Sequence, residues 1–250
     1  MSDVIDFPVG GYRFVKGVFQ YSAAVAALPG YRIEHVRFAK PVVLAEGFAQ
    51  IAGFLKAQGR PLTALCAAEL RSPAPFDDQG FLDFNKQYSA VLGQWGLLSL
   101  GHNPVSRSNV CPDIAPPATP SFYAFSYATP AADAPPSFVN AGSGESIEGR
   151  PTYAEGTVAY RDLSPAGMLA KARHVHTIME DRMTPLGFGW EDVTATQIYT
   201  VHDIHPFLAE DLVRRGAANH GVTWHYCRPP IIDLEYEVDC RGVHVERVLA

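Results

Sequence analysis

The chain has 250 residues, of which 47% are hydrophobic and 18% charged, so it can bury a core as one large domain or as two of ordinary size. The net charge of −6 and the lack of any basic run argue against a nucleic-acid surface, which needs clustered Lys and Arg. No apolar stretch approaches the length of a membrane span, and the first residues are acidic rather than a basic leader.

The four cysteines lie far apart in the sequence, and no two of them form a Cys-x-x-Cys pair. This spacing is typical of reduced thiols in a cytosolic protein. We therefore expect a cytoplasmic location and no disulfide framework.

The first half of the chain predicts strands at 14–28 and 31–38, separated by a Pro-Gly turn. A helix follows, because apolar residues recur at helical spacing before Gly59 (Leu44, Phe48, Ile51 and Leu55). Residues 62–70 are short and flanked by breakers, which favours a strand. A second helix is indicated by one aromatic-rich face (Phe81, Phe84, Tyr88, Leu92 and Trp95), and residues 121–127 predict another strand.

The Pro- and Ala-rich segment 128–137 is typical of a linker, and after it the order of elements repeats. Strands are expected at 138–142 and within 149–158. Ser164 and Pro165 predict a helix start, followed by an apolar stripe (Met168, Ala172, Val175, Met179 and Met183). A β-branched strand at 193–201 and a helix at 206–219 come next.

Two dipeptide pairs repeat at the same spacing: Thr-Ala at 63 and 194, and Pro-Phe at 75 and 206. Each half then has the order ββαβαββ. The prediction is an α+β protein with an N-terminal domain at 1–130 and a C-terminal domain at 137–250. Each domain would be a mixed sheet with two helices on one face.

The last predicted strand, 233–240, alternates between an apolar face and a face of four carboxylates (Asp233, Glu235, Glu237 and Asp239). This face is either solvated surface or part of a site. Its counterpart at 121–127 carries no carboxylate, so the fold does not require acids there. This favours a function for Glu235 and leaves Asp233 and Asp239 as expected surface charge.

Three stretches carry a resemblance to a known family: 193–203 (VTATQIYTVHD) with its following Pro-Phe helix, 103–110 (NPVSRSNV), and 234–237 (LEYE). On these residues, each half resembles the Rid/YjgF family of reactive intermediate deaminases, and the likeness covers most of both halves. It implies a chorismate-mutase-like α+β fold and a homo-oligomer, as a trimer of tandem subunits or a pseudo-trimeric arrangement. It also implies hydrolysis of enamines or imines with neither a metal nor an organic cofactor.

The resemblance implies that Arg107 binds a substrate carboxylate and that Glu235 is the catalytic acid. The neighbouring carboxyl of Glu237 is expected to disfavour ionisation of Glu235 and so help to keep it protonated. Arginine suits the first role because its planar fork binds a carboxylate bidentately. The family's serine falls near Ser22, with Tyr21 beside it.

Each half departs from the family pattern. Phe122 stands at the acid position of the first half, and Ala141 takes the serine position of the second. The arginine position of the second half falls on either Thr223 or Arg228, and the residues do not decide between them. The simplest hypothesis is one composite site that takes groups from both halves.

Other residues have competing interpretations. Cys111 and Cys227 could line the cleft and bind substrate, although buried structural thiols are favoured. The histidines match no metal-binding spacing, so no metal site is expected. The stretch 142–146 (GSGES) could cradle an anion, but a tight turn is favoured.

The predicted function is a hydrolytic deaminase of a small enamine or imine carboxylate, either a 2-imino acid or an aminomuconate-type intermediate. A carboxylate would supply acid–base catalysis, and the expected partner is a small carboxylate-bearing substrate, with no nucleic acid and no membrane. The alternatives are a non-catalytic metabolite-binding or regulatory protein, and a different hydrolase or lyase on the same fold.

Overall fold

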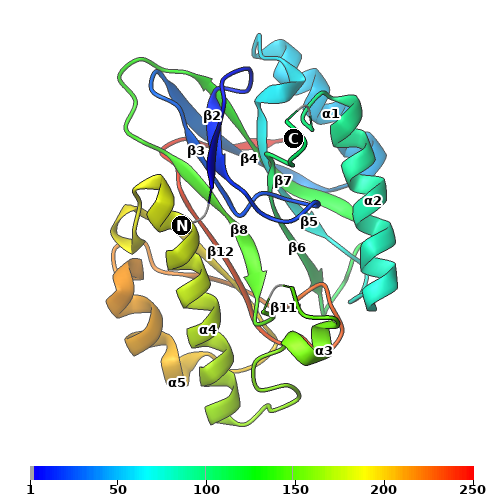
Figure 1. Ribbon diagram of the computed structural model, residues 1–250, viewed down its shortest axis with the longest axis vertical. Coiled ribbons are helices and arrows are strands. Elements are labelled where there is room, and N and C mark those ends of the chain that lie inside the picture. Colours follow the sequence, from blue (N-terminus) through cyan, green and yellow to red (C-terminus); the bar gives the residue numbers. More distant parts are fainter. Residues whose placement is uncertain (1–2, 99, 148) are drawn as a thin grey trace.

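The computed structural model describes residues 3–98, 100–147 and 149–250. Two β-sheets lie between two sets of helices, with α1 and α2 on one side and α4 and α5 on the other (Figure 1). The sheets approach closely where Ser108 of one sheet lies against Gly142 of the other. No helix in the described ranges is both long enough and apolar enough to cross a membrane.

The strands of the described chain form a seven-stranded and a six-stranded sheet. The first has the order β1 (Val4–Phe7), β2 (Tyr12–Val15), β3 (Ala24–Ala27), β8 (Phe138–Gly144), β12 (Glu237–Gly242), β9 (Ala195–Tyr199) and β10 (Thr223–His225). The second has the order β11 (Cys227–Arg228), β6 (Ser106–Pro112), β5 (Leu65–Arg71), β7 (Ser121–Pro130), β4 (Tyr31–Val43) and β13 (Glu246–Leu249).

Both sheets are mixed, because β10–β9, β5–β6 and β13–β4 are parallel pairs and the other pairs are antiparallel. The predicted α+β class is therefore confirmed.

Two long helices cover the six-stranded sheet: α1 (Leu44–Ala57) and α2 (Asp78–Gln94). The predicted stripe of α1 is buried at Phe48, Ile51 and Leu55, and Phe48 packs edge-on against Phe122 of β7. Asp77 caps α2 by accepting a hydrogen bond of 2.7 Å from the Gly80 backbone N–H. Both predicted helices of the first half are confirmed.

The seven-stranded sheet is covered by α4 (Pro165–Met183) and by α5 (His205–Leu208), which continues as a π-helix at Ala209–Ala217. Ser164 accepts a hydrogen bond from the Gly167 backbone N–H, so the predicted cap is confirmed. One further α-helix is short, α3 (Tyr153–Gly156), and three 3-10 turns lie at Leu62–Ala64, Thr184–Leu186 and Trp190–Asp192.

The two ends of the chain pair with strands from the opposite half of the sequence. Strand β3 pairs with β8, which brings residues 4–27 into the seven-stranded sheet. Strand β13 pairs with β4 in the other sheet. The segment predicted as a linker, 128–137, begins inside β7, which ends at Pro130. The division into domains at 1–130 and 137–250 stays a prediction.

Several local predictions are wrong. The strand expected at 14–28 is divided into β2 and β3, with residues 16–23 between them. The strand expected from Asp233 begins at Glu237, because Asp233 adopts a φ of 68° in a turn where Asn and Asp are tolerated. Residues 153–156 form helix α3 rather than a strand. The expected turn at 142–146 is occupied up to Gly144 by β8.

Candidate active site

One pocket of about 370 Å³ lies between α2, the loop before β3, the end of β8 and the segment 230–234. This volume falls in the range of small-molecule sites. Three residues predicted for the site line it: Tyr21, Arg107 and Glu237. Arg107 lies on β6 and Glu237 on β12, so the pocket combines the first and second halves of the sequence.

Arg107 is 3% exposed and is surrounded by aromatic rings. Its guanidinium carbon lies 5.0 Å from the ring centre of Tyr88, 5.7 Å from those of Tyr21 and Phe84, and 5.8 Å from that of Phe81. Its Nη1 has no hydrogen-bond partner in the described ranges. Burial lowers the pKa of Arg107, because the charged form loses its hydration. A buried guanidinium without a bonded partner is suited to receive an anion.

Glu237 is the first residue of β12 and is 4% exposed. Its Oε1 lies directly above Gly142, where a side chain would collide with it. Burial is the main reason that the pKa of Glu237 is raised well above its ordinary value, and the nearby Asp239 raises the pKa further. Arg107 and Arg182 act in the opposite direction. The carboxyl is therefore held in its protonated form well above the pH at which an exposed Glu ionises.

Asp239 also faces the inside of the sheet pair, so its expected surface position is wrong. It accepts hydrogen bonds from the Ser108 hydroxyl, from Gln197 Nε2 at 2.9 Å and from the Tyr199 hydroxyl at 2.8 Å. Gln197 Nε2 also lies 3.1 Å from Oε2 of Glu69. Burial and the charge of Glu69 raise the pKa of Asp239. The acidic face of β12 is thus built into the interior between the sheets.

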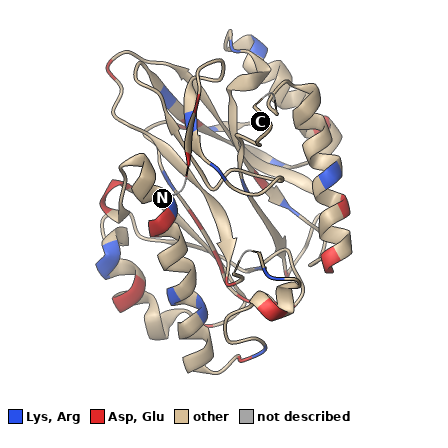
Figure 2. Ribbon diagram, in the orientation of Figure 1, with Lys and Arg blue, Asp and Glu red and all other residues tan. Residues whose placement is uncertain are grey.

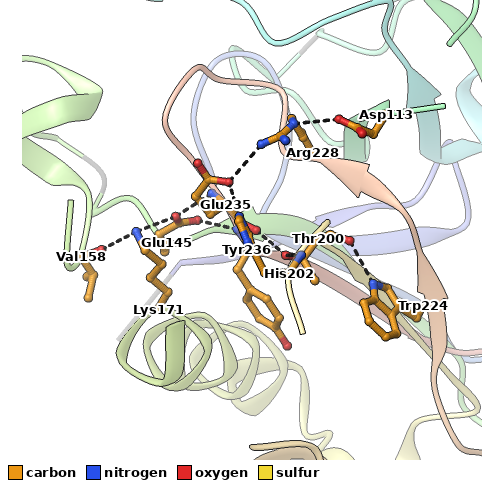
Figure 3. Close-up of polar contacts among 10 residues, drawn as sticks. All are labelled: Asp113, Glu145, Val158, Lys171, Thr200, His202, Trp224, Arg228, Glu235 and Tyr236. Atoms are coloured by element: carbon orange, nitrogen blue, oxygen red, sulfur yellow. Dashed lines mark hydrogen bonds and ion pairs between the residues drawn. The ribbon is translucent and has the colours of Figure 1, made fainter. Parts of the chain in front are cut away.

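Glu235 lies outside the pocket, in the segment just before β12, where it belongs to a cluster of polar contacts (Figure 3). Its Oε2 is 2.7 Å from His202 Nε2 and 3.3 Å from Arg228 Nη1. Arg228 also donates to Asp113 at 2.9 Å. Neither Glu235 nor Arg228 lines the pocket, and each already has a partner of opposite charge.

The backbone around Glu235 is held by a buried ion pair that Figure 3 also shows. Glu145 accepts the backbone N–H groups of Glu235 at 2.7 Å and Tyr236 at 3.1 Å. Lys171 donates to Glu145 at 3.1 Å, and both side chains are fully buried. This pair fixes the segment whose Ile231 and Leu234 form one wall of the pocket.

Ser22, Cys111 and Cys227 do not line the pocket. The Ser22 hydroxyl donates to the Pro104 carbonyl at 3.1 Å. Both cysteines are buried where β11 pairs with β6. Burial raises the pKa of Cys227 to about 11 and raises that of Cys111 as well, so both thiols stay protonated at neutral pH.

Four further residues of the site were absent from the sequence prediction. Asn85, Asn109 and Ser143 line the pocket. Arg182 of α4 lies behind it and donates from Nη1 to the carbonyls of Ala141 at 3.1 Å and Gly142 at 3.3 Å. Two of them carry a signal in the sequence: Asn85 is a polar residue on the apolar face of a predicted helix, and Ser143 lies in the stretch 142–146, for which an anion cradle is the less favoured interpretation.

Charged residues are spread over the outer helices, and a few lie on the strands between the layers (Figure 2). In the described part of the chain, no group of three or more His, Cys, Asp or Glu side chains is placed to hold a metal ion. The pocket combines the buried guanidinium of Arg107, the buried carboxyl of Glu237 with its raised pKa, and apolar walls. These features suit acid–base chemistry on a small carboxylate.

Comparison with known proteins identifies the protein family to which the chain belongs. The family model described as 2-aminomuconate deaminase CnbZ matches residues 4–247, and the chain belongs to this family. It is 48% identical over 251 residues to a 2-amino-5-chloromuconate deaminase from Comamonas testosteroni, with 100% of both chains covered. The predicted likeness to deaminases is therefore confirmed at the level of this family.

Solved structures show more distant similarity. A chorismatase matches with a TM-score of 0.46 and 12% identity, over 96% of this chain and 78% of that one. A Rid-family protein of unknown function from Yersinia pestis matches with a TM-score of 0.31 and 19% identity, over 43% and 78%. A cyanuric acid hydrolase from A. caulinodans matches with a TM-score of 0.40 and 13% identity, over 86% and 67%.

Proposed function

We propose that this protein hydrolytically deaminates 2-aminomuconate-type dicarboxylates, including ring-chlorinated derivatives such as 2-amino-5-chloromuconate. The observation that carries the proposal is the buried guanidinium of Arg107, which shares one pocket with the buried carboxyl of Glu237. Family membership supplies the substrate class. The apolar residues of the pocket, such as Phe81, Ile231 and Leu234, suit a carbon chain with or without a chlorine substituent.

In this mechanism, Arg107 binds the carboxylate next to the amino-bearing carbon. Glu237 donates its proton to the enamine carbon, which converts the enamine into an iminium ion. The resulting carboxylate then accepts a proton from water as the water oxygen attacks the iminium carbon. The carbinolamine collapses with loss of ammonia, so that substrate and water give a 2-oxo acid and ammonia. Burial raises the pKa of Glu237, which favours the protonated form that this step needs.

The catalytic role that the sequence resemblance gave to Glu235 passes in this proposal to Glu237. The two residues are neighbours on the predicted acidic face, but only Glu237 lines the pocket. Arg107 and Tyr21 keep their proposed substrate-binding roles. Arg228, Ser22, Cys111 and Cys227 take structural roles instead, because each lies outside the pocket and is bonded or buried elsewhere.

The composite-site hypothesis is retained, because β6 and β12 supply Arg107 and Glu237 from opposite halves of the sequence. We infer that the two halves descend from a tandem pair of Rid-like units at 1–130 and 137–250. Exchange of the terminal strands between sheets would then be a later elaboration. The homo-oligomer and the cytoplasmic location remain predictions.

The test is ammonia release from 2-aminomuconate by three variants. Glu237→Gln should lower kcat by about 10²–10⁴-fold, as expected for loss of a general acid–base group. Arg107→Ala should raise KM strongly, because a buried cation for the substrate carboxylate is lost. Glu235→Gln is the matched control and should stay within a few-fold of wild type. Loss of activity in Glu235→Gln with an active Glu237→Gln would overturn the assignment, and saturable binding without turnover by wild type would favour the non-catalytic alternative.

A further inference from the structure

Asn85 is a buried polar residue that the mechanism so far does not use. It lies on the inward face of α2, three residues before Tyr88 and four after Phe81. It is 1% exposed, and neither Oδ1 nor Nδ2 has a hydrogen-bond partner in the described ranges. Buried amides are nearly always hydrogen-bonded in folded proteins, so an amide with both ends free requires an explanation.

The free amide belongs to the pocket and lies on the same helix face as the Arg107 cage. Asn85 lines the pocket directly. The rings of Phe81 and Tyr88, which flank Asn85 on α2, lie 5.8 and 5.0 Å from the Arg107 guanidinium. A carboxylate bound to Arg107 would therefore sit over the stretch of helix that presents Asn85.

Two other unpaired groups that line the pocket, Arg107 Nη1 and Asn109 Nδ2, can only donate. Arg107 Nη1 is a donor by chemistry. Asn109 has an unpaired Nδ2, whereas its Oδ1 already accepts a hydrogen bond of 2.9 Å from the Ser72 hydroxyl. Donors suit a carboxylate but not an N–H group. Two unpaired neutral acceptors line the pocket, Gln20 Oε1 and Asn85 Oδ1. Asn85 is the one that two rings of the Arg107 cage flank on its own helix, so its Oδ1 is placed for a nitrogen next to that carboxylate.

We propose that Asn85 is a specificity-determining residue that recognises the nitrogen at C2 of the substrate. Its Oδ1 accepts a hydrogen bond from the amino or imino N–H. The 2-oxo product carries no proton on the corresponding oxygen and cannot donate to Oδ1, so the same residue favours release of product. This inference rests on the proposed function, since it takes the substrate class from it.

The experiment compares a ligand with the nitrogen and a ligand without it. Dissociation constants for 2-aminomuconate and for cis,cis-muconate are measured by calorimetry in the Glu237→Gln background, which keeps the substrate intact. Asn85→Leu should weaken 2-aminomuconate about tenfold, the scale of one lost hydrogen bond, and change muconate by less than threefold. In the otherwise wild-type enzyme, the same substitution should raise KM for 2-aminomuconate by a similar factor.

Ser89→Ala is the matched control. Ser89 lies one turn further along α2, is buried, and also has an unpartnered hydroxyl, but it does not line the pocket. It should leave both dissociation constants unchanged. Asn85→Leu should not lower the melting temperature, because it removes an unsatisfied buried amide, whereas a purely structural asparagine would lower it.

Equal weakening of both ligands, or no weakening of either, would overturn the role of Asn85. Failure of the proposed function has a different signature: wild type then releases no ammonia from 2-aminomuconate. The ratio of the two dissociation constants is still measured in that case, directly in wild type, so the assignment of Asn85 is decided independently of turnover.

Discussion

Gly142 determines how closely the Glu237 carboxyl can approach β8. A Cβ at this position would collide with Oε1 of Glu237 and lie 3.1 Å from Cα and Cβ of Ser108. Because Ser108 is buried and bonded to Asp239, the carboxyl of Glu237 is the group that must move.

Gly142→Ala should therefore lower kcat for 2-aminomuconate at least tenfold and cost about 1–3 kcal/mol of unfolding free energy, the usual range for overpacking. Steady-state kinetics and urea unfolding measure the two effects. Gly144→Ala is the control on the same strand, because its nearest neighbour is the flexible Cδ1 of Leu234 at 3.1 Å. A fully active Gly142→Ala would show that the position of Glu237 is not critical.

At the residue scale, the sequence supplied half of the site. Arg107 was found through its motif, and Glu237 through the alternation of its strand. Glu235 was ranked above it because alternation treats all positions of one face as equivalent. The turn at Asp233 breaks that equivalence, because β12 begins only at Glu237. Glu235 therefore lies before the strand, where its carboxylate contacts His202 and Arg228.

At the scale of elements, the helices were predictable and the strand pairing was not. The stripes of α1, α2 and α4 follow helical spacing and are local properties of the sequence. The pairing of β3 with β8 and of β13 with β4 joins residues more than a hundred positions apart. No periodicity encodes such partners, so the interior position of Asp239 could not be derived before the sheets were seen.

The segment between β11 and β12 depends on the buried pair of Glu145 and Lys171. Lys171→Met removes the cation and leaves Glu145 buried while it still accepts the N–H groups of Glu235 and Tyr236. Breaking a buried pair on one side typically costs about 3–5 kcal/mol. We expect a loss of unfolding free energy of that size in urea titrations, together with a higher KM, because Ile231 and Leu234 line the pocket.

The control for this prediction is Arg161, which contacts the same segment from the solvent side. Arg161 pairs with Asp233 at 2.9 Å, but its side chain is 69% exposed. Exposed pairs contribute little, so Arg161→Ala should leave the urea midpoint nearly unchanged. Equal destabilisation by both substitutions would contradict the view that the inner pair holds the segment.

At the scale of the whole molecule, the space between the two sheets holds carboxyl groups that are removed from water. The pKa of Glu237 and that of Asp239 are both raised, chiefly by burial. An unfolded Glu has a pKa of about 4.3. Above that pH the folded state holds a proton that the unfolded state has lost, so folding stability falls as the pH rises toward the folded pKa of Glu237.

Glu237→Gln removes the contribution of this residue to the difference in bound protons between the folded and unfolded states. The difference in unfolding free energy between the variant and wild type should grow with pH, by up to about 1.4 kcal/mol per pH unit, from about pH 4.3 to the folded pKa of Glu237. Urea unfolding at a series of pH values measures it. The buried histidines, His35 and His176, have pKa values lowered to about 3 by burial, but they are common to both proteins and cancel in the difference.

Parallel stability curves for the two proteins would mean that Glu237 ionises as an ordinary glutamate, and the source of the catalytic proton would then be lost. The predicted divergence links stability to activity, because the same raised pKa sets the upper pH limit of turnover. Activity should therefore decline around the pH at which the stability difference between the two proteins stops growing, because both changes occur at the folded pKa of Glu237. The interior between the sheets would then serve both to keep the acid protonated and to limit how stable the fold can be at high pH.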